Sequence, residues 1–369
     1  MSKVIHHLYA SQVAFSSDQI HEGEPVTEFQ QVADKSFDLD FFNDKMTFDD
    51  GAEHEMWAFQ TPTSGKVFPS PLLRINEGEM FHATVHPSKR VHTIHWHGLE
   101  PDPRNDGVGH TSFEVTGSYT YQWAPNVGIP GSPNDGTAGT YFYHCHVNTP
   151  LHVQMGMLGP MVVDPVVHPD FPVTPGARRS FVDGPEYDIE TETILASYSL
   201  DERWHTLDHA AGLSGEDVGL DRFEPTHFYL LGGELARGPQ AEGPWQLTSM
   251  RANAAGGSRK PTLLRLVNAN YFPVDMRFTD AAGRPVVMAE LLGHDGRAYR
   301  DTSSRLGTSP PVGETGPPLT TSFISFGAAE RHDVLLRPPA PGTYRLTVTL
   351  RHWITRAVIA TRVIPITVT

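Results

Sequence analysis

The sequence predicts an all-β protein built from two β-sandwich domains. The chain of 369 residues contains 33 glycines and 31 prolines, which predicts many turns and no long helices. Residues 80–85 and 344–351 alternate between apolar and polar side chains, the period of two expected of a half-buried strand. The sequence Gly-Thr-Tyr occurs at 139–141 and again at 342–344, which indicates two copies of one sandwich.

The length fits two domains at about 150 residues each. Residues 1–55 are polar and acidic, so we interpret them as an N-terminal arm, with an extra strand or two on the first domain as the alternative. Clear strand signals start at Trp57, and the first domain is expected over 56–172. A turn-rich, proline-rich stretch then forms the linker, and the second domain is expected over 180–369.

The individual strands are predicted from short runs of apolar, β-branched and aromatic residues between turn signals. Such runs repeat at short intervals through both halves of the chain, the pattern of a sandwich or barrel. The strands expected in order are 80–85, 139–144 and 161–164 in the first domain, and 193–198, 227–231, 263–268, 333–336 and 344–351 in the second.

Charge and composition exclude several function classes. The formal net charge of −15 argues against nucleic acid or an anionic membrane as partner, because both attract basic surfaces. No run approaches the about 18 apolar residues of a membrane span. Residues 1–20 lack the apolar core of a signal peptide, so we expect a cytoplasmic protein unless an export signal has been trimmed. A single cysteine excludes an intrachain disulfide framework, while 20 histidines suggest metal binding.

The first histidine cluster lies on a predicted strand. His95 and His97 are two residues apart, so they project to one face at a separation of about 7 Å. His92 precedes His95 by three residues and projects to the opposite face. One strand therefore offers a ligand to one site and a ligand pair to another, although a lone His-X-His is more typical of a surface pair.

The second cluster surrounds the only cysteine. Cys145 lies between His144 and His146, and His152 and Met157 follow. Two imidazoles, a cysteine thiolate and a weak axial methionine are the ligands of a blue-copper site, and imidazole also suits Cu(II). Taken singly, Met157 is typical of core filling. Together the two clusters predict a copper site of His92, Cys145, His152 and Met157, and a second one of His95, His97, His144 and His146.

The two predicted sites are joined covalently. Cys145 is bonded directly to His144 and His146, so an electron can leave the first site through the cysteine sulfur and the backbone of a histidine. A nucleophilic role for Cys145 is the less favoured alternative, because its histidine neighbours indicate a metal-bound thiolate.

These motifs resemble the multicopper oxidase family of laccase-like cupredoxin enzymes. The segment from Phe68 to Glu79 resembles the strand and turn that open their domains. The sequence His-Trp-His-Gly at 95–98 is similar to their first-domain signature. The sequence His-Cys-His at 144–146, with the downstream His and Met, is similar to their cysteine-containing signature. The resemblance implies two cupredoxin-like Greek-key sandwiches and covers most of the chain from about Trp57.

The resemblance also implies a role for each ligand. It assigns His95 to type 2 copper, and Asp106 to a position beside the type 2 water where it delivers protons during O2 reduction. The alternative for Asp106 is an ordinary turn residue before Gly107. The remaining ligands divide between type 1 copper (His92, Cys145, His152, Met157) and the type 3 pair (His97, His144, His146).

The second half of the chain departs from the family pattern. The family's three-copper cluster uses eight histidines from two domains, and this chain shows only one half-set. The segment 270–278 contains no histidine where a ligand strand is expected. We interpret most of the scattered histidines there as surface residues; they are His205, His209, His227, His294, His332 and His352.

Three functions follow from this incomplete set. The first is a laccase-like copper oxidase in a homo-oligomer, in which two first domains meet across a two-fold axis and complete the cluster. It would oxidise a phenol, an aromatic amine or a low-valent metal ion and reduce O2. The second is a nitrite-reductase-like enzyme with type 1 and type 2 copper, which leaves His95 and His146 without a role. The third is a non-enzymatic copper carrier or electron-transfer protein.

Overall fold

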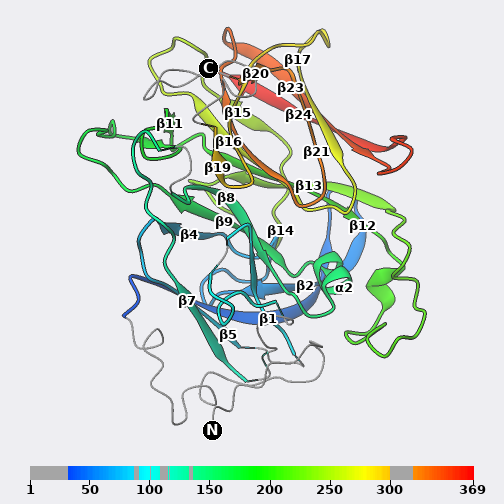
Figure 1. Ribbon diagram of the computed structural model, residues 1–369. Coiled ribbons are helices and arrows are strands. Elements are labelled where there is room, and N and C mark those ends of the chain that lie inside the picture. The colour runs from blue at the N-terminus through cyan, green and yellow to red at the C-terminus, as the bar shows by residue number, and fades with distance from the viewer. Residues whose placement is uncertain are drawn as a thin grey trace.

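The computed structural model describes residues 32–86, 91–99, 101–108, 115, 117–132, 136–299 and 319–369. Within these ranges the chain forms two β-sandwiches stacked end to end (Figure 1). Strands β1 and β5 lie at the bottom of the view, and β23 and β24 lie at the top. None of the described helices is long and apolar enough to cross a membrane. The prediction of an all-β chain is therefore confirmed.

The first sandwich consists of two four-stranded sheets. One sheet has the order β2-β1-β5-β7, and the other has the order β4-β9-β8-β6. Buried aromatic side chains from both sheets fill the space between them, including Trp96, Tyr121 and Tyr143. The strands are β1 Lys35–Thr47, β2 Glu53–Gln60, β4 Leu73–Asn76, β5 Phe81–His86, β6 His95–His97, β7 Tyr119–Trp123, β8 Gly139–His144 and β9 Leu158–Asp164.

The N-terminal arm is a correction to the sequence prediction. Residues 35–47 form β1, which pairs parallel with β5 and antiparallel with β2 inside the first sheet. Leu39 of β1 is fully buried in the core of the sandwich. The alternative of added strands therefore holds for residues 32–55, and residues 1–31 lie outside the described residues. The acidic clusters misled the prediction because β1 places its aspartates on the solvent side and its apolar residues inward.

The second sandwich is larger and packs a sheet of seven strands against one of five. The larger sheet runs β13-β12-β16-β22-β18-β19, with β20 on β18, and the smaller runs β15-β24-β23-β17-β21. The strands are β12 Thr193–Leu200, β13 His227–Glu234, β15 Met250–Ala252, β16 Thr262–Asn268, β17 Val274–Asp280, β18 Ala289–His294, β19 Arg297–Ala298, β20 Leu319–Thr321, β21 Phe323–Phe326, β22 Arg331–Leu336, β23 Gly342–Arg351 and β24 Val358–Val368.

Short elements connect the two sandwiches. In the predicted linker, β10 (Ala177–Arg179) pairs with β11 (Glu186–Asp188), and β3 (Val67–Phe68) pairs across the domains with β14 (Gly243–Pro244). The helices among the described residues are α2 (Thr149–Met155) and the single 3-10 turn η3 (Trp204–Thr206). Helix α2 contacts the segment 201–226, which links β12 to β13 and lies beside it in Figure 1.

An apolar interface holds the sandwiches together. Met56 of β2, Phe142 of β8 and Tyr198 of β12 belong to one buried cluster that draws residues from both domains. Phe68 and Tyr198 pack edge to face at 5.0 Å between ring centres. Because β8 carries His144 at its end, this packing also fixes the histidine face against the second domain.

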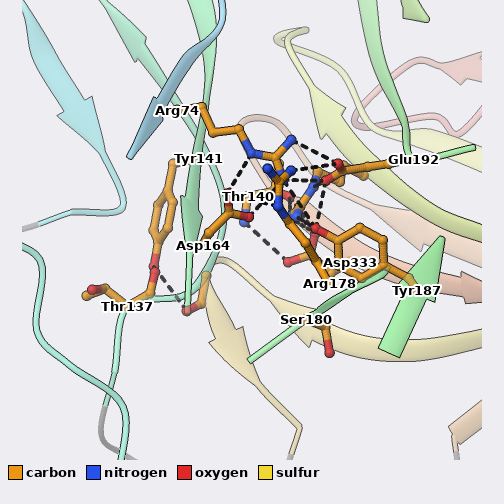
Figure 2. A network of polar contacts seen from close by, with 12 residues as sticks. Arg74, Thr137, Thr140, Tyr141, Asp164, Arg178, Ser180, Tyr187, Glu192 and Asp333 are labelled. Carbon is orange, nitrogen blue, oxygen red and sulfur yellow. Dashed lines mark hydrogen bonds and ion pairs between the residues drawn. The ribbon is translucent and has the colours of Figure 1, made fainter. Parts of the chain in front are cut away.

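A buried polar network reinforces the interface (Figure 2). Arg265 of β16 donates from Nε to Glu192 at 2.7 Å, and Arg74 of β4 donates to the other oxygen of Glu192 at 2.8 Å. Thr140 of β8 donates its hydroxyl proton to Asp333 of β22. Burial alone raises the pKa of Glu192, but the charges of Arg265 and Arg74 outweigh it and lower the pKa to about 2. Glu192 therefore stays ionised at the domain junction.

We expect Arg265→Ala to destabilise the protein strongly, by about 3–5 kcal/mol, because it leaves the buried carboxylate of Glu192 with one cation fewer. Guanidinium denaturation measures the loss. Lys45→Ala is the control, since it breaks an ion pair whose side chains are 68% and 54% exposed. That change should cost less than about 1 kcal/mol. Equal losses in the two variants would contradict the importance of the network.

Candidate copper centres

The cysteine-centred site lies where β8 ends, inside the first sandwich. The Sγ of Cys145 is 3.5 Å from Nδ1 of His92 and 3.3 Å from Nδ1 of His152. All three residues are fully buried. Metal bonds of about 2.0 Å to nitrogen and 2.3 Å to sulfur, at 120°, would put these atoms about 3.7 Å apart. The three atoms therefore fit a trigonal copper site without a large rearrangement.

The backbone ties the fourth predicted ligand to this group. Met157 is fully buried; its N–H donates to the carbonyl of His152, and its carbonyl accepts from the N–H of Cys145, both at 3.0 Å. Gly156 makes this turn with φ of 112°, and any side chain there would press on Phe68 and on the backbone of Trp57. Helix α2 places His152 next to Cys145, because Gly156 ends the helix one turn beyond it.

The second group of histidines forms one cluster on the opposite side of the same strands. Trp96 of β6 points into the core, so its neighbours His95 and His97 project together toward β8. The centre of the His95 ring lies 5.8 Å from that of His97, 5.2 Å from His144 and 5.3 Å from His146. The structure thus brings the four predicted ligands together.

Hydrogen bonds fix which ring nitrogens face the cluster. Nδ1 of His144 bonds to the carbonyl of Cys145 at 2.9 Å, while its Nε2 lies 3.3 Å from Nδ1 of His97. Nδ1 of His95 bonds to the carbonyl of Asp106 at 2.9 Å, which leaves its Nε2 for a metal. Such partners hold the tautomer and the orientation of a metal-binding imidazole.

Asp106 lies where the sequence prediction puts it. Its carboxylate oxygen is 3.3 Å from Nδ1 of His95, and its side chain is 21% exposed, so it bridges the cluster and solvent. Gly107 makes this approach possible, because a side chain there would collide with the carbonyl of Ile94. The geometry suits a proton carrier, and the role of Asp106 stays a prediction.

Three of the candidate histidine ligands are held neutral at physiological pH. Burial, with a smaller contribution from the charge of Arg331, lowers the pKa of His97 to about 4. Burial and the neighbouring His209 lower the pKa of His152 to about 3. Burial also lowers the pKa of His144 well below its ordinary value. Unprotonated imidazoles are the form that binds a metal, so both groups are prepared for coordination.

The second domain closes over the four-histidine cluster. A cavity of about 260 Å³ separates the two, lined on one side by the histidines and Phe142. Its far wall comes from the ends of β16, β17 and β22 in the same chain. That wall offers no imidazole, carboxylate or thiolate among the described residues; it contains Asn268, Ala269, Asn270, Tyr271, Ala328 and Ala329. The missing half-set of ligands is therefore not supplied by this face of the second domain.

Residues 42–167 match the family model described as multicopper oxidase. Over these residues the chain is similar to a multicopper oxidase domain. Copper resistance protein A of Pseudomonas syringae pv. tomato is 36% identical over 100 residues, which are 26% of this chain and 14% of that protein. L-ascorbate oxidase of Cucumis sativus is 28% identical over 162 residues, 42% of this chain and 22% of that protein. The chain thus matches less than a quarter of the length of these relatives.

A solved structure extends the likeness in fold to both domains. The blue copper oxidase of Nitrosomonas europaea superposes with a TM-score of 0.56 at 21% identity, covering 90% of this chain and 86% of that one. Two cupredoxin-type sandwiches are therefore confirmed as the fold. Copper is the metal of this domain family, and the thiolate and imidazole donors described above suit it.

The sequence prediction missed one residue of the cysteine-centred site. His209, in the segment 201–226, approaches His92 to 3.1 Å between their Nε2 atoms, and its carbonyl lies 3.0 Å from Nε2 of His152. Its ring stacks on Trp57 at 5.1 Å. The sequence prediction of surface residues is wrong for His209, which is only 9% exposed, and for His332, which is 8% exposed. No spacing motif marks His209, because it comes from the second domain.

We expect His209→Ala to weaken the copper site, because His92 loses the imidazole that lies beside its Nε2, whereas the backbone carbonyl beside His152 remains. Losses of this kind typically cost 10–100-fold in metal affinity or activity. Copper retention during dialysis and the copper hyperfine splitting in electron paramagnetic resonance (EPR) measure the effect. His352→Ala removes an imidazole far from both sites in sequence and serves as control; unchanged copper retention in both variants would contradict the role of His209.

Proposed function

We propose that the protein is a copper-dependent oxidase. It takes single electrons from a small reductant, either a phenol, an aromatic amine or a low-valent metal ion, and passes them to O2. The observation that carries the proposal is the covalent junction of the two ligand groups: Cys145 belongs to one, and His144 and His146 belong to the other. Copper supplies the one-electron redox chemistry when bound.

The residues form two groups, one that would accept electrons from the reductant and one that would reduce O2. His92 and His152, together with Cys145, would hold the electron-accepting type 1 copper in a water-free pocket. The oxygen-reducing centre would take its type 2 and type 3 copper ligands from His95, His97, His144 and His146. Asp106, which is partly exposed to solvent, would supply protons beside His95.

We propose that a second copy of the chain completes this centre in a homo-oligomer. The support is the incomplete ligand set: the four histidines face a wall that contains no metal ligand among the described residues. An isologous contact between two first domains would bring two half-sets together.

The nitrite-reductase-like alternative gains no support from the geometry, because His95 and His146 lie in the same cluster as the other two histidines. A cytoplasmic location remains part of the proposal.

The test combines copper content with oxygen uptake. The copper-loaded protein should be intensely blue and consume O2 with a phenolic, amine or metal-ion donor. Sharing of a three-copper centre by two chains predicts about 2.5 copper ions per chain. Two ions per chain and nitrite consumption would support the reductase alternative, and one ion without turnover would support the carrier. A colourless copper-loaded protein with reduced Cys145 would overturn the type 1 assignment.

A further inference from the structure

A third group of metal-binding side chains lies at the junction of the two domains. His54 comes from β2 of the first sandwich, Glu202 follows β12, and His227 begins β13 of the second. One ligand atom from each lies within 4.8 Å of the others. We propose that His54, Glu202 and His227 bind a divalent transition-metal ion separate from the two copper centres.

The spacing of the group is that of ligands around an ion. Nδ1 of His227 lies 3.1 Å from the hydroxyl of Thr226, a contact that an ion would replace; its separation of 3.6 Å from Oε1 of Glu202 is too long for a hydrogen bond. It is close to the edge of about 3.4 Å of a tetrahedral site with bonds of about 2.1 Å. The rings of His54 and His227 lie 4.6 Å apart at 68°, so they do not stack face to face.

A chain of hydrogen bonds orients the buried ligand. Nε2 of His54 lies 2.9 Å from the hydroxyl of Tyr229, which in turn donates to the carboxylate of Asp50 at 3.0 Å. Phe48 stacks on Tyr229 at 4.2 Å and limits its movement. Metal-binding histidines are commonly held in this way, with the second ring nitrogen bonded to a fixed acceptor. This arrangement leaves Nδ1 of His54 for the ion.

Charge and exposure favour a cation that enters from solvent. Glu202 is 56% exposed and His227 is 21% exposed, whereas His54 is 5% exposed. Asp50 adds a second carboxylate behind Tyr229. Two imidazoles and one carboxylate form the donor set of many zinc sites with one open position, and they also suit Cu²⁺. We therefore assign the site to Zn²⁺ or Cu²⁺ rather than to Mg²⁺ or Ca²⁺, which prefer all-oxygen ligands.

The position of the site gives it a structural consequence. An ion here would join β2 to the segment 201–226, the segment that carries His209 over the cysteine-centred site. The ion would lie between two domains and stabilise their contact, since it binds only the folded arrangement. The site goes beyond the proposed oxidase function and does not depend on it.

The experiment titrates Zn²⁺ into the full-length protein after copper loading and dialysis against a chelator, which removes copper held outside the two copper centres. Calorimetry gives the stoichiometry and affinity, and the thermal midpoint is recorded with and without Zn²⁺. We compare the wild type with H54Q/H227Q and with the control H352Q, which also removes an imidazole from the second domain. The blue absorption of each protein reports that the fold and the copper sites are intact.

We expect the wild type and H352Q to bind one more equivalent of Zn²⁺ than H54Q/H227Q does, or to bind it at least 100-fold more tightly. At 100 times the dissociation constant, Zn²⁺ should raise the thermal midpoint by about 5 °C or more in these two proteins. Identical isotherms for all three blue proteins would overturn the proposal. If the double variant loses its colour, the single variant Glu202→Gln, which changes only an exposed carboxylate, replaces it under the same criteria.

Discussion

Cys145→Ser abolishes the intense visible absorption of the copper-loaded protein and lowers oxygen consumption by more than about 100-fold. The colour requires a thiolate bound to copper, and a serine hydroxyl at the same position is not a comparable ligand. The loss should exceed the 10–100-fold effect typical of indirect ligand partners, because the side chain itself makes the metal bond. Absorption spectroscopy and an oxygen electrode measure the two effects.

Cys145→Ser changes the side-chain volume little, so the protein should stay folded and the effect on copper can be measured directly. Serine is nearly isosteric with cysteine, and the polar atoms nearest its hydroxyl would be Nδ1 of His92 and of His152, which lie 3.5 and 3.3 Å from Sγ in the native protein. Copper bound by the four-histidine cluster should remain, so total copper per chain should fall by about one ion. Retention of the blue colour in Cys145→Ser would show that another group supplies the charge-transfer ligand, and the type 1 assignment would then be wrong.

Local sequence patterns predicted the ligand strands because those strands obey a simple period. His95, Trp96 and His97 alternate across β6, and the buried Trp96 fixes which face the histidines take. The His-Cys-His sequence at the end of β8 works in the same way. The two ligand groups could therefore be separated by counting residues, before any three-dimensional information was used.

Contacts between distant segments were beyond that reasoning. β1 looks like a polar arm in the sequence because aspartates alternate with its apolar residues at 38–41, and its parallel pairing with β5 has no local signal. His209 reaches His92 across 117 residues from a turn-rich segment. Arg265 and Glu192 are ordinary charged residues until the pairing of β12 with β16 in the second domain brings them together in a buried pair. These features depend on contacts between segments that are far apart in the sequence, which no single strand encodes.

His97→Ala is expected to abolish oxygen consumption while leaving the blue colour intact. Removing one imidazole breaks the ligand set around His144, whose Nε2 lies 3.3 Å from Nδ1 of His97. The cysteine-centred site uses side chains from the opposite face of the strands and loses no donor. A rapid-mixing experiment should therefore show the blue band bleached by a donor in the variant as in the wild type, but failing to return when O2 is added.

The control for this variant is His168→Ala, which removes a surface imidazole beside Asp170 and should change neither the colour nor the oxygen uptake. Copper content adds a second readout, because loss of the oxygen-reducing centre lowers it while the type 1 ion stays. If His97→Ala still consumes O2 at the wild-type rate, oxygen is not reduced at the histidine cluster. The cluster would then be a binding site without a catalytic role, and the carrier function would become the better account of the same ligands.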